Sequence, residues 1–394
     1  HKRSPDQYMK TIYTTDELAE YCKAARNHPY VTIDTEFLRE RTYYSKLCLI
    51  QMAYPGIGDD GAVLVDVLSG KMELDPLLEL FKDESVVKVF HAARQDLEIF
   101  FFDGKGVFPK PFFDTQIAAM VCGFGEQVGY ETLVRKIAKE NLDKSSRFTD
   151  WSQRPLSERQ QLYALADVTH LRAIYEFLAA EIKKTGRVKW VEEELEILTD
   201  PATYIITPDM AWTRVKTRTT SGKFLAVVRE LARFREDFAQ SRNVPRSRVY
   251  KDDAMLELAS TKPKTHSDLA KSRLLMRDAR KGEIADGILA AIEAGTNCPP
   301  SDYPVGTPAH ERAPGSEGLA DLLRVLLKAK AEEAGVAQKL IANASDLDDI
   351  AAGIVDGPAM RGWRRNVFGE DALNLCAGKI ALSANGRSVK LIQI

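Results

Sequence analysis

The sequence predicts an α/β domain with a mixed sheet, followed by two small all-α domains. Segments with strand-like alternation are interspersed with helical periodicity up to about residue 190, and strand-like segments disappear beyond about residue 210. Five prolines between residues 297 and 314 separate two helical stretches, as is typical of a linker. We therefore expect an α/β domain over 1–208, a helical domain over 209–296, a linker over 297–314 and a second helical domain over 315–394.

The elements of the α/β domain follow from residue periodicity and from helix-capping residues. The turn Gly-Ile-Gly-Asp-Asp-Gly predicts that the second and third strands are antiparallel. Ser157 and Gln160 form a capping box that starts the longest helix. The expected strands are 30–37, 47–54, 61–67 and 86–90, and the expected helices are about 74–82, 92–102, 115–122, 130–139 and 157–184.

Beyond residue 210 the pattern is helical with Pro and polar breaks. Asn385-Gly386 in the tail favours a small hairpin over 379–393. The expected helices are 221–241, 252–260, 265–278 and 283–294, followed by a second helical stretch over 316–377.

The composition is that of a globular protein, with 44% hydrophobic and 28% charged residues among 394. The sequence has no run of about 18 apolar residues, so we expect no membrane span. Its five scattered cysteines form no CxxC pair, which argues against a disulfide framework or structural zinc and favours a reducing cytoplasm. Residues 210–282 hold 18 Lys and Arg against 8 Asp and Glu, which fits either a nucleic-acid-binding module or a solvated helical surface.

Four acidic residues are candidates for a metal site. Asp34 and Glu36 are two residues apart in a predicted strand, so their side chains share one face. Two adjacent carboxylates are electrostatically costly unless a cation lies between them, although a solvated edge strand is the commoner explanation of an isolated DxE. Asp96 follows a second buried strand, and Asp167 lies among apolar neighbours in the long helix.

Tyr163 lies four residues before Asp167 and therefore on the same helix face, although on spacing alone a half-buried aromatic residue is the better interpretation. Four carboxylates that need no Cys or His suit hard cations such as Mg²⁺ or Mn²⁺. Two such ions about 3.5–4 Å apart activate water and stabilise a leaving oxygen in phosphodiester hydrolysis.

Three stretches carry a resemblance to a known family. VTIDTEFLRERTYYSKLCLIQ, VFHAARQDLEIF and YALADVTHL resemble the three exonuclease motifs of ribonuclease D, a member of the DEDD superfamily with a ribonuclease H-like fold. In the third stretch the Tyr and the last Asp are separated by three residues, which marks the tyrosine subclass. The resemblance implies that Tyr163 orients the attacking water and that two metal ions are bound by Asp34, Glu36, Asp96 and Asp167.

The resemblance further implies a monomeric 3′→5′ exoribonuclease that releases nucleoside 5′-monophosphates from a single-stranded RNA 3′ end, with tRNA precursors as substrates. The same residues would serve a 3′→5′ exonuclease acting on single-stranded DNA. Two further alternatives are an RNA-binding scaffold with an inert nuclease fold and a helical adaptor that binds no metal.

Residues 210–294 resemble the HRDC domain through the stretch LARFREDFAQSRNVPRSRVYKDDAMLELASTKP, and 316–377 resemble a second, weaker copy. Basic and aromatic side chains are candidates for RNA contact because phosphates attract cations and bases stack on rings. An ordinary surface loop with Trp151 as its hydrophobic anchor is an equally good interpretation of 144–151. The candidates are Lys144, Arg147 and Trp151 in that loop, and Arg242, Arg246, Arg248 and Lys251 in the helical domain.

Three further polar residues lie next to the acidic motifs. Asp114 is expected to cap a helix, in a structural rather than a metal-binding role. His91 and His170 are expected to be hydrogen-bonded neighbours of the site, because a metal-activated water needs no general-base histidine.

Overall fold

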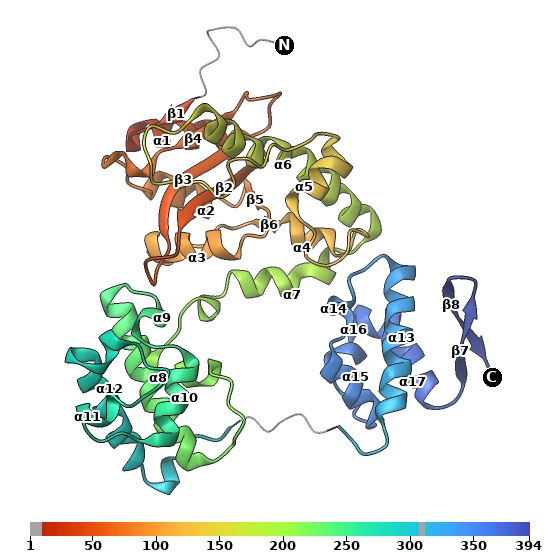
Figure 1. The fold of residues 1–394 in the computed structure, drawn as a ribbon. Helices are drawn as coiled ribbons and strands as arrows, with labels where there is room; N and C mark the ends of the chain where they lie inside the picture. Colours follow the sequence, from red (N-terminus) through yellow and green to blue (C-terminus); the bar gives the residue numbers. More distant parts are fainter. Residues whose placement is uncertain (1–9, 307–311) are drawn as a thin grey trace. The chain divides into compact units, whose positions relative to one another are not determined.

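A computed structural model describes residues 10–306 and 312–394 (Figure 1). These residues form two compact units. The first unit holds the described residues up to Glu36, Leu47–Asp200 and the described residues from 312 onwards; the second holds Phe37–Lys46 and the described residues from Pro201 to 306. Residues 1–9 of the predicted first domain and 307–311 of the predicted linker lie outside the described residues. Within the described ranges, no helix has the length and apolar character needed to cross a bilayer.

A six-stranded sheet in the order β1-β4-β3-β2-β5-β6 forms the framework of the first unit (Figure 1). The pairs β1–β4, β2–β5 and β5–β6 are parallel, whereas β3–β4 is antiparallel. The mixed sheet and the antiparallel second and third predicted strands are therefore confirmed. The strands are β1 (Thr11–Ile12), β2 (Tyr30–Leu38), β3 (Lys46–Ala53), β4 (Ala62–Val65), β5 (Val87–Phe90) and β6 (Phe112–Asp114).

Strands β1 and β6 are absent from the sequence prediction. They contain two and three residues, which is too short for alternation to be recognised. Their pairing depends on longer neighbours, since β1 aligns with β4 and β6 aligns with β5.

The predicted helices of the first unit are present with small shifts at their ends. The capping box of Ser157 and Gln160 starts α6 as expected, and Gly186 ends that helix in a left-handed conformation. The predicted helix over 130–139 consists of α5 and a π-helical turn over Val134–Ala138. The helices are α1 (Thr15–Ala25), α2 (Asp75–Lys82), α3 (Arg94–Asp103), α4 (Thr115–Ala119), α5 (Tyr130–Leu133), α6 (Glu158–Thr185) and α7 (Val188–Leu198).

Two hydroxyl groups fix α6 at the level of Asp167. The hydroxyl of Thr32, fully buried on β2, donates to the carbonyl oxygen of Val168 at 2.7 Å, and the carbonyl oxygen of Ala53 lies 3.1 Å from the same hydroxyl. The Tyr130 hydroxyl on α5 donates to the carbonyl oxygen of Ala166 at 2.7 Å. The carbonyl groups on both sides of Asp167 are therefore held, one from β2 and one from α5.

The second unit is helical, and three of its four predicted helices are confirmed. The prediction of a continuous helix over 265–278 is wrong, because the segment contains only α11 and a separate 3₁₀ turn over Arg277–Arg280. The Arg280 guanidinium donates to the carbonyl oxygens of Ala270, Ser272 and Leu275 and so stabilises a non-helical path. The helices are α8 (Gly222–Arg242), α9 (Arg246–Val249), α10 (Asp252–Thr261), α11 (His266–Leu269) and α12 (Gly282–Thr296).

The segment Phe37–Lys46, which continues from β2, belongs to this second unit. Its Tyr43 hydroxyl hydrogen-bonds to the carboxylate of Glu236, whose side chain is only 1% exposed. Arg246 pairs with the same carboxylate at 2.6 Å and lies over the Tyr43 ring, 4.9 Å from its centroid. A buried charge on α8 is thus neutralised and hydrogen-bonded by two neighbouring segments.

The C-terminal stretch is helical and ends in a hairpin, as predicted. Its strands are antiparallel and pair Asn385 with Ser388 across the turn that contains Gly386 in a left-handed conformation. The elements are α13 (Glu317–Ala334), α14 (Gln338–Ile341), α15 (Ala344–Ala351), α16 (Gly362–Arg364), α17 (Glu370–Cys376), β7 (Ile380–Asn385) and β8 (Ser388–Gln393).

We predict that Thr32→Val lowers the free energy of unfolding by about 1–3 kcal/mol, because the buried carbonyl oxygen of Val168 loses its hydroxyl donor while the side-chain shape is kept. Urea unfolding measures the change. Thr185→Val, at the exposed end of α6, is the matched control. Equal stability of the two variants would show that Thr32 does not hold α6.

Candidate active site

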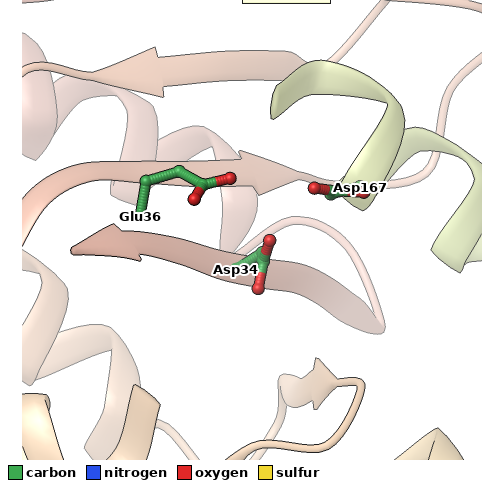
Figure 2. Close-up of side chains that lie close together, drawn as sticks. All are labelled: Asp34, Glu36 and Asp167. Atoms are coloured by element: carbon green, nitrogen blue, oxygen red, sulfur yellow. The ribbon is translucent and has the colours of Figure 1, made fainter. Parts of the chain in front are cut away.

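The structure brings three of the four predicted carboxylates together. Asp34 and Glu36 project from one face of β2, as period-two geometry requires, and Asp167 projects toward them from α6. Each offers a carboxylate oxygen, and these oxygens all lie within 4.8 Å of one another. Figure 2 shows the Glu36 side chain extending toward Asp167, with the Asp34 carboxylate facing the same space. Two segments 131 residues apart in sequence thus share one acidic site.

Asp96 lies beside this cluster rather than within it. It is buried in the first turn of α3, and its carboxylate accepts a hydrogen bond from the hydroxyl of Thr35. Burial first, and then the negative charge of Asp96, raise the pKa of Asp34. The fourth predicted ligand is therefore adjacent to the other three, but it is engaged by a residue of β2.

Because the carboxylates of the cluster repel one another, the site favours either protonation of the carboxylates or binding of a cation. Asp34 and Asp167 open onto a cavity, and all three carboxylates of the cluster are half-buried. Burial first, and then repulsion among the carboxylates, raise the pKa of Asp34 well above its ordinary range and that of Glu36 to about 9. Burial likewise raises the pKa values of Asp96 and Asp167 to about 7. A divalent cation would reverse this preference by stabilising the ionised carboxylates.

Asp114 positions the start of α3 and confirms the structural role predicted for it. Its carboxylate caps α4 by accepting from the Gln116 amide at 2.8 Å. It also accepts from the backbone amides of Ala92 at 3.0 Å and Ala93 at 2.9 Å. Ala92 has a φ of 56°, a left-handed conformation that is unusual for alanine. One buried carboxylate thus stabilises the strained turn that delivers Asp96.

Gln51 is a site residue that sequence reasoning missed. It is fully buried on β3, and its Nε2 lies 3.5 Å from an Asp34 oxygen and 3.4 Å from a Glu36 oxygen. Hydrogen bonding to this amide lowers the pKa of Glu36, in opposition to the larger effect of burial. The available signal was an amide side chain within the otherwise apolar run of β3.

Tyr163 faces the cluster, as the helix spacing predicts. Its hydroxyl hydrogen-bonds to Asp167 and thereby opposes the rise in that carboxyl group's pKa. Burial and the nearby carboxylates raise the pKa of Tyr163 itself, so the phenol stays protonated. Its protonated hydroxyl can therefore orient a water molecule but is poorly suited to removing a proton from one.

The two histidines of these motifs lie outside the three-carboxylate group. The His91 Nδ1 lies 2.8 Å from the Thr115 hydroxyl, which confirms the predicted hydrogen-bonded neighbour. Burial lowers the pKa of His91 and that of His170, so both rings are neutral at pH 7.

A cavity of about 250 Å³ opens beside the acidic cluster. Asp34, Asp167 and Tyr163 form its acidic side, and Lys144 and Arg147 contribute positive charge. The pairing of Lys144 with Glu131 places an ion pair in the same lining. A hollow with acidic and basic sides suits a ligand that carries phosphate near a metal ion.

The predicted stacking role of Trp151 does not fit its position. The Trp151 side chain is only 2% exposed, and its ring centroid lies 6.0 Å from that of Tyr163. A base cannot stack on a ring that protein already covers. Trp151 therefore corresponds to the alternative interpretation, the hydrophobic anchor of its loop.

The four basic candidates of the second unit differ in their surroundings. Arg242 pairs with Glu283 at 2.7 Å, and Arg246 is held by Glu236. Arg248 and Lys251 are exposed. Arg246 thus has a structural partner that charge counting could not reveal, and RNA contact by the other three stays a prediction.

Two family matches cover much of the chain. The family described as "3'-5' exonuclease" matches residues 9–183, and the HRDC domain family matches residues 224–292. The second HRDC copy, over 315–394, stays a prediction.

Curated relatives match almost the full length of the chain. The ribonuclease D of Jannaschia sp. is 62% identical over 384 residues, covering 98% of this chain and 99% of its own. The ribonuclease D of Granulibacter bethesdensis is 46% identical over 383 residues, covering 97% of this chain and 96% of its own.

Solved structures share the fold. Escherichia coli RNase D, described as an exoribonuclease involved in structured RNA processing, superimposes with a TM-score of 0.80 at 28% identity, covering 94% of this chain and 99% of its own. The catalytic core of RRP6 from Trypanosoma brucei superimposes with a TM-score of 0.57 at 20% identity over 74% of this chain and 81% of its own, which shows a shared fold.

We predict that metal-free protein loses stability as the pH rises from about 4 toward 9. The raised carboxyl pKa values mean that the folded state holds protons which the unfolded state has released, so folding becomes less favourable as these groups ionise. Asp34→Asn removes one repelling charge and should raise the melting temperature at pH 8 in EDTA by about 2–4 °C for each kcal/mol relieved. Thermal denaturation measures both effects.

Glu20→Gln, an exposed change on α1, is the control for that experiment and should leave the pH profile unchanged. Added Mg²⁺ should stabilise the native protein more at pH 8 than at pH 5, because metal ligands must be deprotonated. An Asp34→Asn protein less stable than the native one in EDTA at pH 8 would contradict the proposed repulsion.

We also predict that Arg246→Ala destabilises the second unit by about 3 kcal/mol, because the buried Glu236 carboxylate loses its cation. Arg248→Ala, two residues away and exposed, should change stability by less than about 0.5 kcal/mol. Chemical denaturation distinguishes the two variants, and identical curves would mean that the ion pair contributes nothing to folding.

Proposed function

Since this chain belongs to the ribonuclease D family and is a 3′→5′ exoribonuclease, we propose that it hydrolyses a single-stranded RNA 3′ end one nucleotide at a time with two bound divalent metal ions. The product of each step is a nucleoside 5′-monophosphate. The proposed metal ligands are the four carboxylates Asp34, Glu36, Asp96 and Asp167.

The observation that carries this proposal is the close approach of three half-buried carboxylates. Their oxygens lie within 4.8 Å of one another, and burial and repulsion raise their pKa values. Oxygen ligands with no sulfur or imidazole among them suit Mg²⁺ or Mn²⁺. Asp96 is close enough to act on Asp34 electrostatically, and it would complete the ligand set by exchanging its bond with Thr35 for a metal contact.

When bound, such ions supply Lewis acidity, which lowers the pKa of a water molecule and stabilises negative charge on the leaving oxygen. The residues of this chain supply orientation. Tyr163 presents a protonated hydroxyl beside Asp167, where it can hold the attacking water in line with the scissile phosphate. Arg147 lines the same cavity and offers a cation to a phosphate oxygen.

The terminal nucleotide of the substrate would occupy the cavity next to the carboxylates. A cavity of about 250 Å³ accommodates a flexible single strand but not a paired end, so a stably paired 3′ end should slow the reaction. We propose RNAs with structured bodies and free 3′ ends, tRNA precursors among them, as substrates. The exposed Arg248 and Lys251 of the HRDC-like unit are proposed to contact their phosphates without reading sequence.

The proposal also includes Mg²⁺ as the metal, a monomeric enzyme and a reducing, cytoplasmic environment. Five free cysteines support the reducing environment. The alternatives of a DNA exonuclease and an inert scaffold are not favoured, because full-length relatives are ribonucleases.

We predict that a 5′-labelled RNA with a 3′ extension is shortened in single-nucleotide steps in Mg²⁺ and not in EDTA. Asp34→Asn should reduce the rate more than about a thousandfold, because metal binding contributes several kcal/mol to transition-state stabilisation. Tyr163→Phe should reduce the rate about 10–100-fold by losing the orienting hydroxyl. Denaturing gels measure the ladder.

The Glu20→Gln protein should produce the same ladder as the native enzyme. Matched DNA and RNA oligomers test the choice of nucleic acid. A ladder that persists in EDTA, or full activity of both site variants, would overturn the metal mechanism. An RNA band shifted on a native gel without shortening would instead indicate a binding protein.

A further inference from the structure

The loop between the π-helical turn and α6 is anchored by buried side chains and hydrogen bonds. Its Trp151 and Ser146 are buried. The Arg154 guanidinium pairs with Asp66 at 2.8 Å and donates to the carbonyl oxygens of Trp151 at 2.7 Å and Cys48 at 2.8 Å. This part of the loop is thus attached to the sheet through an ion pair and a buried ring.

Between these anchors the loop turns outward over residues 146–149. The Thr149 amide and hydroxyl both donate to the carbonyl oxygen of Ser146, at 3.3 Å and 2.8 Å, and Gln160 of α6 donates to that hydroxyl at 3.1 Å. The tip of the turn carries Arg147 and Phe148. A braced turn keeps these two side chains directed away from the protein core.

Phe148 is unusually exposed for an aromatic side chain. It is 92% exposed, whereas the next large exposed aromatic residue in the described part of the chain, Tyr13, is 51% exposed. Such exposure leaves a large apolar surface in water that packing against the protein would otherwise remove. The ring is therefore largely open to a ligand.

Phe148 is the immediate neighbour of a residue that lines the active-site cavity. The neighbouring Arg147 lines the cavity together with Tyr163 and Asp167. The Arg147 guanidinium carbon lies 5.3 Å from the centroid of the Phe148 ring. Lys144 lines the same cavity. An open aromatic ring thus adjoins Arg147, one of the cations that line the cavity proposed for the terminal nucleotide.

We propose that Phe148 is a stacking platform for the base of a nucleotide on the 5′ side of the one being removed, with Arg147 contacting the phosphate between them. This inference rests on the proposed function, because it requires the RNA 3′ end to occupy the cavity. A ring beside cations is the combination by which proteins bind single strands without sequence preference, since every base has a face to stack. Phe148 therefore takes the role that the sequence pattern suggested for Trp151.

Stacking at this position has a kinetic consequence. The contact forms when the strand binds and is unchanged as the scissile bond breaks, so it strengthens substrate binding more than it accelerates chemistry. Phe148→Ala should raise KM about tenfold with kcat nearly unchanged. Phe148→Trp should restore KM, because it supplies a larger ring at the same place.

The test combines the protein variants with chemically altered RNA. Single-stranded 5′-labelled oligomers carry one abasic ribose at the second, third, fourth or fifth position from the 3′ end. The native, Phe148→Ala and Phe148→Trp proteins are assayed on each, with Ile57→Ala as control. Ile57 is 88% exposed and apolar but is not among the residues lining the cavity.

The expected result is a KM penalty for one abasic position with the native and Phe148→Trp proteins, and no further penalty at that position with Phe148→Ala. Ile57→Ala should behave as the native protein does. The proposal is overturned if Phe148→Ala retains the native KM, or if its penalty multiplies with the abasic penalty at every position. Failure of the native protein to shorten RNA would instead defeat the proposed function. Binding of the same oligomers to Asp34→Asn and to Asp34→Asn with Phe148→Ala, followed by fluorescence anisotropy, would then decide the stacking role.

Discussion

The mutual repulsion of half-buried carboxylates is the constraint on which the rest of the first unit depends. Asp34, Glu36 and Asp167 present oxygens within 4.8 Å of one another, an arrangement that water would relieve if the side chains could move apart. In the metal-free protein, the fold itself must oppose that separation. The same repulsion makes the site selective for a small, highly charged cation. Only such an ion neutralises several neighbouring negative charges at once.

The opposing contacts are buried hydrogen bonds that act on the backbone around each ligand. Thr32 and Tyr130 hold the carbonyl groups on both sides of Asp167, whereas Asp114 holds the left-handed turn at Ala92 that precedes Asp96. These contacts come from β2, α5 and the end of β6. The geometry of the acidic site is therefore maintained by supporting residues, whose hydrogen bonds replace those that excluded water would make to the backbone.

Positive charge and aromatic rings are distributed between structural and ligand-facing roles by their local surroundings. Arg246 belongs to a patch of sequence with a surplus of basic residues, yet it neutralises the buried Glu236, while Arg248 two residues later is exposed. Trp151 is buried under its loop, while Phe148 is open to solvent. In both pairs, two residues that lie within three positions of each other face different surroundings, because side-chain direction changes from one residue to the next.

The sequence by itself determined the mixed α/β domain, the main strands and helices, and the identity of the acidic residues, because periodicity and short-range spacing are local properties. The spacing of Asp34 and Glu36 defines a shared strand face, and that of Tyr163 and Asp167 defines a shared helix face. Only tertiary structure decided that β2 faces α6, that Gln51 lies between two carboxylates, that Asp96 is engaged by Thr35, and that Phe148 rather than Trp151 is exposed. These outcomes depend on contacts between segments far apart in the chain, and the free energy of such contacts is set by packing that no local pattern encodes.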